Sequence, residues 1–413
     1  MKNDYVLSMV NKIITVLTGF IATIFLTRYL GVVLKGQYTY ILQVLQIITL
    51  ILSLGMGQSI TYFYKLNGPK VVSKFMSTFI IKSILVITIS IIASFIMEDI
   101  TMLIILLYLP IFGLKYELEI IMATINVRLK IFMHILYYIL KMIGAVLLFF
   151  VGSQYLWMPF LMLGLLDLMV ILIYIYDAHV EYSVIEKLSL DWKFIKEVVS
   201  YSWLLVFTTL LITMNYNADV ILLEHLSSPI DLGLYSVSIG IINYLWLIPD
   251  SFKDILYSRV SRSSSLEPIL ISIKASIYII LMFIVIFAIF GEFALSLFFG
   301  QEFINAYGVT IILSIGAISM IFFKMIGVIF DAEGRRDLTF KILLISVVTN
   351  LILNFITIPK YGMYGAAIST VFSYSACGIL CLVFFKKIYN LEIKDIFLLS
   401  SEELDKIKSI FSN

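Results

Sequence analysis

The sequence predicts an all-α integral membrane protein with about twelve transmembrane helices in two parallel six-helix lobes. Hydrophobic residues make up 61% of the 413 residues and charged residues only 14%, whereas a soluble domain is about half apolar and about a quarter charged. The apolar runs are roughly 20 residues long, which is the length that crosses the hydrocarbon core as a helix. They do not alternate with polar residues, as the strands of a membrane barrel would. Since only helices and closed barrels satisfy their backbone inside lipid, the expected class is helical.

Turn-forming residues divide the chain into twelve expected spans. These are 5–29, 37–64, 71–97, 101–125, 130–151, 155–178, 194–223, 232–257, 268–290, 303–330, 337–358 and 362–388. The turn signals are Gly68-Pro69, Gly152-Ser153, Ser227-Ser228-Pro229, Gly300, Gly334 and Pro359.

The longest internal connection, at about residues 179–193, separates six spans from six. We expect a first lobe at 1–178, a cytoplasmic linker at 179–193, a second lobe at 194–388 and a tail at 389–413. A capping-box pattern in the tail predicts a short amphipathic helix on the cytoplasmic surface, and a frayed tail is the alternative.

The distribution of lysine and arginine predicts the orientation. With the N-terminus inside, most cations fall in inner segments and only Arg28, Lys35 and Lys360 fall in outer ones. Both termini are therefore expected in the cytoplasm. The first run follows only Lys2 and Asp4 and has no small-residue cleavage site, so we expect a retained helix rather than a signal peptide.

Charged residues inside the expected spans are the first candidates for a site. Lys82, Lys115, Lys141 and Asp167 each lie roughly 12 to 17 residues from a neighbouring turn, which at about 1.5 Å per residue predicts one layer near mid-membrane. Charges in that position are costly and usually face a cavity or a partner. Lys274 and Lys324 are the other lysines within spans, and both lie nearer the cytoplasmic end.

Two interpretations of this layer compete. In the structural one, Lys141 pairs with Asp167, and Lys115 pairs with Glu119 four residues along the same helix. In the functional one, the lysines form a cationic patch in a hydrated cavity that is able to hold a pyrophosphate. Asp167 and Glu119 are candidates for ion coupling or for ion pairing.

A second group of polar residues lies in the later spans. Asn215, Asn217 and Asp219 lie toward the outer end of the seventh span, and Asn350 and Asn354 are four apart in the eleventh. Hydrogen bonding between helices is the favoured interpretation for the asparagine pair. Asp219 is a candidate both for ion coupling and for ion pairing.

Several function classes are disfavoured by the sequence. There is no nucleophile elbow, phosphate-binding loop or metal-ligand spacing, so no enzyme activity, cofactor or metal is expected. Cys377 and Cys381 have no second pair or nearby histidine and are interpreted as helix-packing residues. The net charge of +2 gives no indication of a nucleic-acid partner.

Five segments, in order along the chain, resemble motifs of a known transporter family. They are 26–31 and 36–38 (LTRYLG and GQY), 54–59 (LGMGQS), 217–222 with 232–236 (NADVIL and LGLYS), 298–303 (FFGQEF) and 358–370 (IPKYGMYGAAIST). They resemble the polysaccharide-transporter branch, which includes the O-antigen flippases, of the multidrug/oligosaccharidyl-lipid/polysaccharide exporter superfamily. Where that family has an acid before the second motif, this chain has Ser53 or Leu54.

The resemblance implies a V-shaped two-lobed transporter of the bacterial inner membrane that alternates between inward- and outward-open states. It implies a flippase for a polyprenyl-pyrophosphate-linked oligosaccharide, with cationic cavity residues for the pyrophosphate. Arg28 enters this set by motif, and Lys82, Lys115 and Lys141 enter it by depth alone. The expected partners are the lipid-linked oligosaccharide and membrane lipids, with a polysaccharide polymerase and chain-length proteins as further candidates.

Two other functions stay open at this point. One is a cation-coupled exporter of drugs or other small molecules from the same superfamily. The other is a membrane glycan polymerase or acyltransferase, which the absence of a large outer loop disfavours. Neighbouring glycosyltransferase genes would favour the flippase over the exporter.

Overall fold

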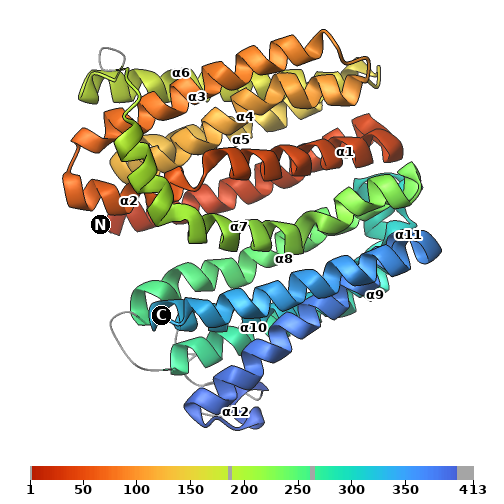
Figure 1. Ribbon diagram of the computed structural model, residues 1–413. Coiled ribbons are helices and arrows are strands. Elements are labelled where there is room, and N and C mark those ends of the chain that lie inside the picture. The colour runs from red at the N-terminus through yellow and green to blue at the C-terminus, as the bar shows by residue number, and fades with distance from the viewer. Residues whose placement is uncertain (1, 185–187, 261–265, 398–413) are drawn as a thin grey trace. The chain divides into compact units, whose positions relative to one another are not determined.

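The computed structural model describes residues 2–184, 188–260 and 266–397, and the regular structure within these ranges is helical throughout (Figure 1). The helices form two compact units, residues 1–213 and 214–413. The division falls inside helix α7 (Trp192–Leu226) rather than in the connection before it. The lobe boundaries at 178 and 194 stay a prediction, and the expected tail helix lies outside the described residues.

The first unit is built around α4. Its helices are α1 (Lys2–Ser53), α2 (Met56–Asn67), α3 (Lys70–Ser94), α4 (Ile100–Ile125), α5 (Val127–Val151), α6 (Trp157–Tyr182) and the first part of α7. Helix α4 packs against α1, α2, α3, α5 and α6, and α1 also packs along α5. Side chains on different faces of α4 therefore meet different neighbours.

The second unit is built around α10, whose residues are mostly buried. Its helices are the end of α7, α8 (Pro229–Val260), α9 (Glu267–Phe298), the 3₁₀ turn η2 (Gln301–Phe303), α10 (Ala306–Ala332), α11 (Arg336–Tyr389) and α12 (Ile393–Phe397). Helix α10 packs against α8, α9 and α11. Cys377 and Cys381 are buried free thiols on α11.

Ten helical stretches in the described part of the chain are long and apolar enough to cross a membrane. Two of them, Asn11–Asn67 and Arg336–Tyr389, have 57 and 54 residues. At 1.5 Å per residue each is at least about 80 Å long, roughly twice the thickness of a bilayer with its headgroups. Each is bent at a glycine, and counting each as two crossings gives the predicted twelve. The chain is a multi-pass, all-helical membrane protein.

The two bends correct the expected turns. Gly31 has φ 63° and Gly362 has φ 53°, a region that glycine adopts without steric cost. The outer loop expected at residues 30–36 is absent because the helix resumes directly after Gly31. The turn expected at Pro359 lies instead at Gly362, since proline has a φ compatible with a helix and Pro359 stays inside α11.

The second expected span, 37–64, is not continuous. Leu54 and Gly55 have φ of 48° and 67°, and they separate α1 from α2. A side chain at Gly55 would collide with Val206 and would meet Ser202, both on α7. The glycine therefore permits the positive φ and also the close approach of α7.

Candidate functional site

Charged and tyrosine side chains from four helices meet within the first unit. We call them the cationic cluster: Lys35 from α1, Tyr108, Lys115 and Glu119 from α4, Tyr137 and Lys141 from α5, and Asp167 from α6.

Lys115 is the most heavily contacted member of the cluster. Its ammonium lies 3.0 Å from Oδ1 of Asp167 and 3.7 Å from Oε1 of Glu119. It also lies 3.7 Å from the ring centroid of Tyr137, in reach of a cation–π interaction. The expected pair of Lys115 and Glu119 is thus present, and Lys115 has a second carboxylate partner that the sequence did not predict.

Asp167 is completely buried and is held by its neighbours. It accepts a hydrogen bond from the hydroxyl of Tyr108 and forms its ion pair with Lys115. The close ion pair of Asp167 is with Lys115 and not with Lys141, as the structural interpretation had it, and Asp167 attracts Lys141 only at longer range. Depth along a helix does not tell which face a residue occupies. Lys115 occupies the face of α4 that packs on α6.

Lys141 and Lys35 are the unneutralised cations of the cluster. Neither forms an ion pair with any residue in the described ranges. Lys141 lies 5.8 Å from the ring centroid of Tyr138, and its charge is repelled by Lys115 and Lys35 and attracted by Asp167. Lys35, only 9% exposed, donates to Thr39 at 3.2 Å. Its expected position in an outer loop is wrong, since that loop is helix.

The cluster consequently carries a surplus of positive charge. It contains three lysines (Lys35, Lys115 and Lys141) and two carboxylates, those of Glu119 and Asp167. A buried charge without a partner is expensive in a membrane protein and usually marks a site that meets a charged ligand. Lys35 was missed as a candidate because only the tight bend at Gly31 brings it into the helix.

Lys82 belongs to a different contact. It forms an ion pair with the fully buried Glu117 and lies 3.4 Å from the carbonyl of Leu52, next to the break between α1 and α2. Glu117 is two residues from Lys115, which is about 200° around the helix and so on another face. Lys82 therefore lies at a depth similar to that of Lys115, but it belongs to a separate contact and not to the cationic cluster. Glu117 is a partner that the sequence did not predict.

Arg28 is the candidate for pyrophosphate binding that was taken from a motif. It lies three residues before the bend at Gly31, and its side chain is exposed. Its place is the end of the first span rather than the middle, as the motif that carries it predicts.

The second unit contains a buried polar group without lysines. Asp219 on α7 is completely buried and accepts hydrogen bonds from the hydroxyls of Tyr235 on α8 and Thr370 on α11, the latter at 2.9 Å. One turn earlier, Oδ1 of Asn215 accepts hydrogen bonds from Ser346 and Ser373, each at 2.9 Å.

Helical spacing brings the asparagines of α11 to the same region. Asn350 is one turn beyond Ser346, as Asp219 is one turn beyond Asn215, so both lie near Thr370. Asn354 donates to Asn350 at 3.0 Å, within the helix. Four side-chain atoms of this polar group are buried without a hydrogen bond: Oδ1 of Asp219, Oδ1 of Asn354, Nδ2 of Asn350 and Nδ2 of Asn215. Unsatisfied buried polar atoms are rare and indicate a ligand or strain.

Lys324 forms an ion pair and contacts two aromatic rings. It is 2.8 Å from Oδ1 of Asp250, and its ammonium lies 4.8 Å from the Trp246 ring and 5.6 Å from the Tyr216 ring. Such a paired and stacked lysine stabilises the contact of α10 with α8.

Known proteins resemble the chain in sequence and in fold. A family model described as polysaccharide biosynthesis protein matches residues 1–248. The capsular polysaccharide biosynthesis protein CapF of Staphylococcus aureus is 27% identical over 201 residues, which are 47% of this chain and 51% of CapF. The chain therefore aligns with only about half the length of this relative.

Solved structures share the fold over nearly the whole chain. The lipid II flippase MurJ, in an inward closed conformation, matches with a TM-score of 0.72 at 15% identity, covering 98% of this chain and 92% of that one. An inward-facing transporter of the multidrug resistance MATE family matches with a TM-score of 0.70 at 13% identity, covering 91% and 94%. Both are named as transport proteins, and at this level of identity the likeness shows a shared fold.

Proposed function

This chain belongs to the polysaccharide biosynthesis protein family, and on that premise we propose that it is a flippase for a polyprenyl-pyrophosphate-linked oligosaccharide. The oligosaccharide would be the repeat unit of an O-antigen or a similar surface polysaccharide, moved across the membrane by alternating access. The likeness to CapF supports the link to surface polysaccharide, and the fold shared with MurJ supports the movement of a lipid-linked molecule.

The surplus positive charge of the cationic cluster is the observation that carries the proposal. A pyrophosphate is a compact, multiply charged anion that ammonium groups bind as point charges. We assign its binding to Lys141 and Lys35, which form no ion pair with a carboxylate in the described ranges. Lys115 is oriented toward the same region by Asp167 and Glu119.

An apolar groove next to the cluster supports a lipid carrier. Its volume is about 300 Å³, and it lies between α4 and α6, with Ile104, Leu107, Phe160 and Leu161 among its lining residues. Tyr108 takes part in both places, since its ring lines the groove while its hydroxyl binds Asp167. The proposal therefore has the prenyl chain in this groove with its pyrophosphate at the cluster.

The polar group of the second unit supports coupling to a cation. Asp219 and Asn354 offer buried oxygen atoms without hydrogen bonds, and oxygen is the ligand that hard cations prefer. We propose that a sodium ion or a proton binds at Asp219 and supplies the driving force. Asp167 is the less favoured carrier, because Lys115 already neutralises it.

A cation-coupled exporter of small molecules is the second candidate function. The fold shared with a MATE transporter and the Asp219 group are compatible with it. An apolar drug has no use for the unneutralised Lys35 and Lys141, which favours the flippase. A glycan polymerase or acyltransferase is disfavoured by the transport proteins among the fold relatives.

The placement in the cell is part of the proposal. We propose the bacterial inner membrane with both termini in the cytoplasm, on the basis of the lysine and arginine distribution. A polymerase and chain-length proteins would then act on the flipped product.

Deleting the gene tests the proposed function. The account expects loss of the surface polysaccharide together with accumulation of its lipid-linked repeat unit on the inner side. Re-expressing the wild type should restore the polysaccharide, and re-expressing Lys141→Ala should not. Normal surface polysaccharide in the deletion strain, with increased sensitivity to small toxic compounds, would support the exporter instead.

A further inference from the structure

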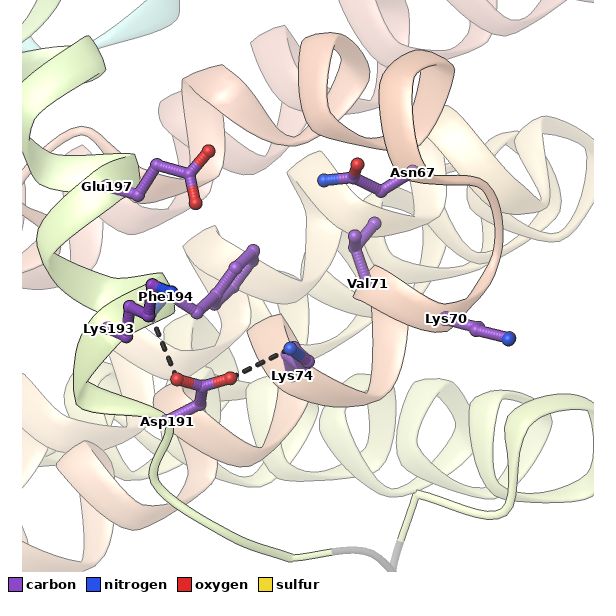
Figure 2. A pocket seen from close by; sticks show the side chains of 8 residues that line it. All are labelled: Asn67, Lys70, Val71, Lys74, Asp191, Lys193, Phe194 and Glu197. Atoms are coloured by element: carbon purple, nitrogen blue, oxygen red, sulfur yellow. Dashed lines mark hydrogen bonds and ion pairs between the residues drawn. The ribbon is translucent and has the colours of Figure 1, made fainter.

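The first unit also has a pocket at the end of its helices. It has a volume of about 410 Å³ and lies between the turn that joins α2 to α3 and the start of α7 (Figure 2). Val71 and the buried ring of Phe194 form its apolar part. None of its lining residues takes part in the cationic cluster.

Charged side chains surround this apolar part. Lys70, Lys74 and Lys193 contribute three ammonium groups, and Asp191 and Glu197 contribute two carboxylates. The helices α3 and α7 both begin here, so the positive ends of two helix dipoles add to the lysines. The pocket thus has a positive balance.

Two of these charges are already used within the protein. Lys74 lies 2.8 Å from Oδ2 of Asp191, while Oδ1 of Asp191 accepts the backbone N–H of Phe194 at 3.0 Å. The hydrogen bond from Lys74 and then that from Phe194 hold the pKa of Asp191 below its usual range, so the carboxylate stays ionised at neutral pH. The pair connects α3 to the start of α7 and leaves the other lysines to act on a ligand.

Lys70 and Lys193 form no ion pair with the residues that the structure describes. They lie on opposite sides of the pocket in Figure 2, with the ammonium of Lys70 directed outward from the rim, so a bound headgroup would require its flexible side chain to turn inward. Glu197 and Asn67 lie on the remaining rim and offer acceptor oxygens. An anion held by the two lysines would therefore have hydrogen-bond acceptors beside it.

The pocket lies at a membrane surface. Lys70 and Trp192 are the first residues of two membrane-spanning helices, and Trp192 is 72% exposed. An exposed tryptophan beside lysines is typical of the headgroup region. The lysine and arginine distribution assigns this surface to the cytoplasmic leaflet.

We propose that this pocket binds an anionic, hydroxyl-bearing phospholipid headgroup of the cytoplasmic leaflet, with phosphatidylglycerol as the representative ligand. Lys70 and Lys193 bind the phosphate, and Glu197 and Asn67 accept hydrogen bonds from the glycerol hydroxyls. Basic pockets between transmembrane helices bind anionic headgroups in this way. The lipid stabilises the junction of α3 with α7 that Lys74 and Asp191 already hold. Free phosphate shares the charged part of this chemistry, but not the hydroxyls or the acyl chains.

Native mass spectrometry of the full chain in detergent, titrated with phosphatidylglycerol or with phosphatidylcholine of the same acyl chains, tests the assignment. We expect saturable binding of phosphatidylglycerol and weaker binding of phosphatidylcholine. The double variant Lys70→Ala/Lys193→Ala should bind phosphatidylglycerol about 25-fold more weakly, since each lysine near a membrane surface contributes about a fivefold factor. Lys70→Arg/Lys193→Arg should retain binding, and Glu197→Gln should also retain it because glutamine keeps an acceptor.

The matched control is Lys341→Ala, which removes an exposed lysine in the second unit. It should leave binding unchanged, and thermal unfolding in detergent should show that all variants are folded. Equal binding by wild type and Lys70→Ala/Lys193→Ala overturns the proposal, as does an equal loss in Lys341→Ala. Inorganic phosphate and phosphatidylethanolamine are titrated in the same way. Phosphate that binds at the lysines as tightly as phosphatidylglycerol also overturns the proposal. So does tighter binding of phosphatidylethanolamine than of phosphatidylglycerol, if that preference is lost in Glu197→Gln. The assay contains no transport step, so its failure and a failure of the flippase proposal are distinguishable.

Discussion

The ammonium of Lys115 lies 3.0 Å from Oδ1 of Asp167 and joins α4 to α6 inside the first unit. Since Lys115 also forms an ion pair with Glu119, both carboxylates of the cationic cluster are paired with the same lysine. That arrangement leaves Lys35 and Lys141 without an ion pair in the described ranges. It separates a lysine that holds the helices together from lysines that can meet a ligand.

Removal of Lys115 should therefore affect stability. In Lys115→Ala the buried carboxylate of Asp167 loses its ion pair, and we expect a loss of about 3–5 kcal/mol. The double variant Lys115→Ala/Asp167→Asn should recover most of that loss, because asparagine carries no charge and can still accept from Tyr108. Thermal unfolding of the purified variants in detergent measures both effects. Equal melting temperatures for the single and the double variant would contradict the pairing.

Lys82 should behave as a structural residue rather than as a ligand for the substrate. Lys82→Ala leaves Glu117 buried without its ion pair next to the break between α1 and α2, so the protein should lose about 3–5 kcal/mol of stability. In Lys82→Met/Glu117→Gln both charges are removed, and stability and polysaccharide export should largely return. Export by the double variant is the decisive measurement. A stable double variant that does not export would return Lys82 to the set of substrate-binding residues.

Asp219 should control the dependence on a cation. Asp219→Asn keeps the size of the side chain and its acceptor oxygen for Tyr235 and Thr370 but removes the charge. Transport in proteoliposomes should lose its response to an imposed sodium or proton gradient. Asp337→Asn, at an exposed position paired with Lys341, is the matched control and should respond normally. A full gradient response in Asp219→Asn would remove this residue from the coupling site.

The bend at Gly362 should not tolerate a side chain. Its φ of 53° costs an alanine about 1–2 kcal/mol, and the added Cβ would collide with Asp231 and lie 3.2 Å from Oγ of Ser227. Gly362→Ala should lower the folded yield and the melting temperature. Gly240→Ala is the comparison, because a Cβ there meets open space in a regular helix. Similar melting temperatures for the two variants would show that the bend is not strained by a side chain.

The sequence allowed the fold class and the number of crossings to be predicted, since both follow from the length and composition of apolar runs. The positions of the turns could be predicted less well from the sequence. The helix resumes at once after Gly31, and the break at Leu54 and Gly55 follows from the close approach of α7, which no local pattern reveals.

The site was predicted only in part for a related reason. Counting residues from turns locates a side chain along its helix, and Lys115, Lys141 and Asp167 do contribute to one cluster. It does not give the rotation of the helix, so it could not tell that Asp167 pairs closely with Lys115 rather than Lys141, or that Lys82 at a similar depth meets Glu117 on another face. Glu117 carries no signal in the sequence beyond a charge in an apolar run. The motif resemblance supplied the family, which no single contact reveals.

Binding of a polyprenyl pyrophosphate to the purified protein tests the central claim most directly, because it depends on Lys141 and on no transport step. The wild type, Lys141→Ala, Lys141→Arg and the control Lys341→Ala would be compared by isothermal titration in nanodiscs of one lipid composition. Loss of one desolvated ammonium contact should cost about 1.5–3 kcal/mol, which weakens binding by roughly 10- to 150-fold in Lys141→Ala. Lys141→Arg should retain most of the affinity, and Lys341→Ala should equal the wild type. Equal affinity of Lys141→Ala and the wild type, with both proteins folded, would contradict the assignment of the cationic cluster to the pyrophosphate.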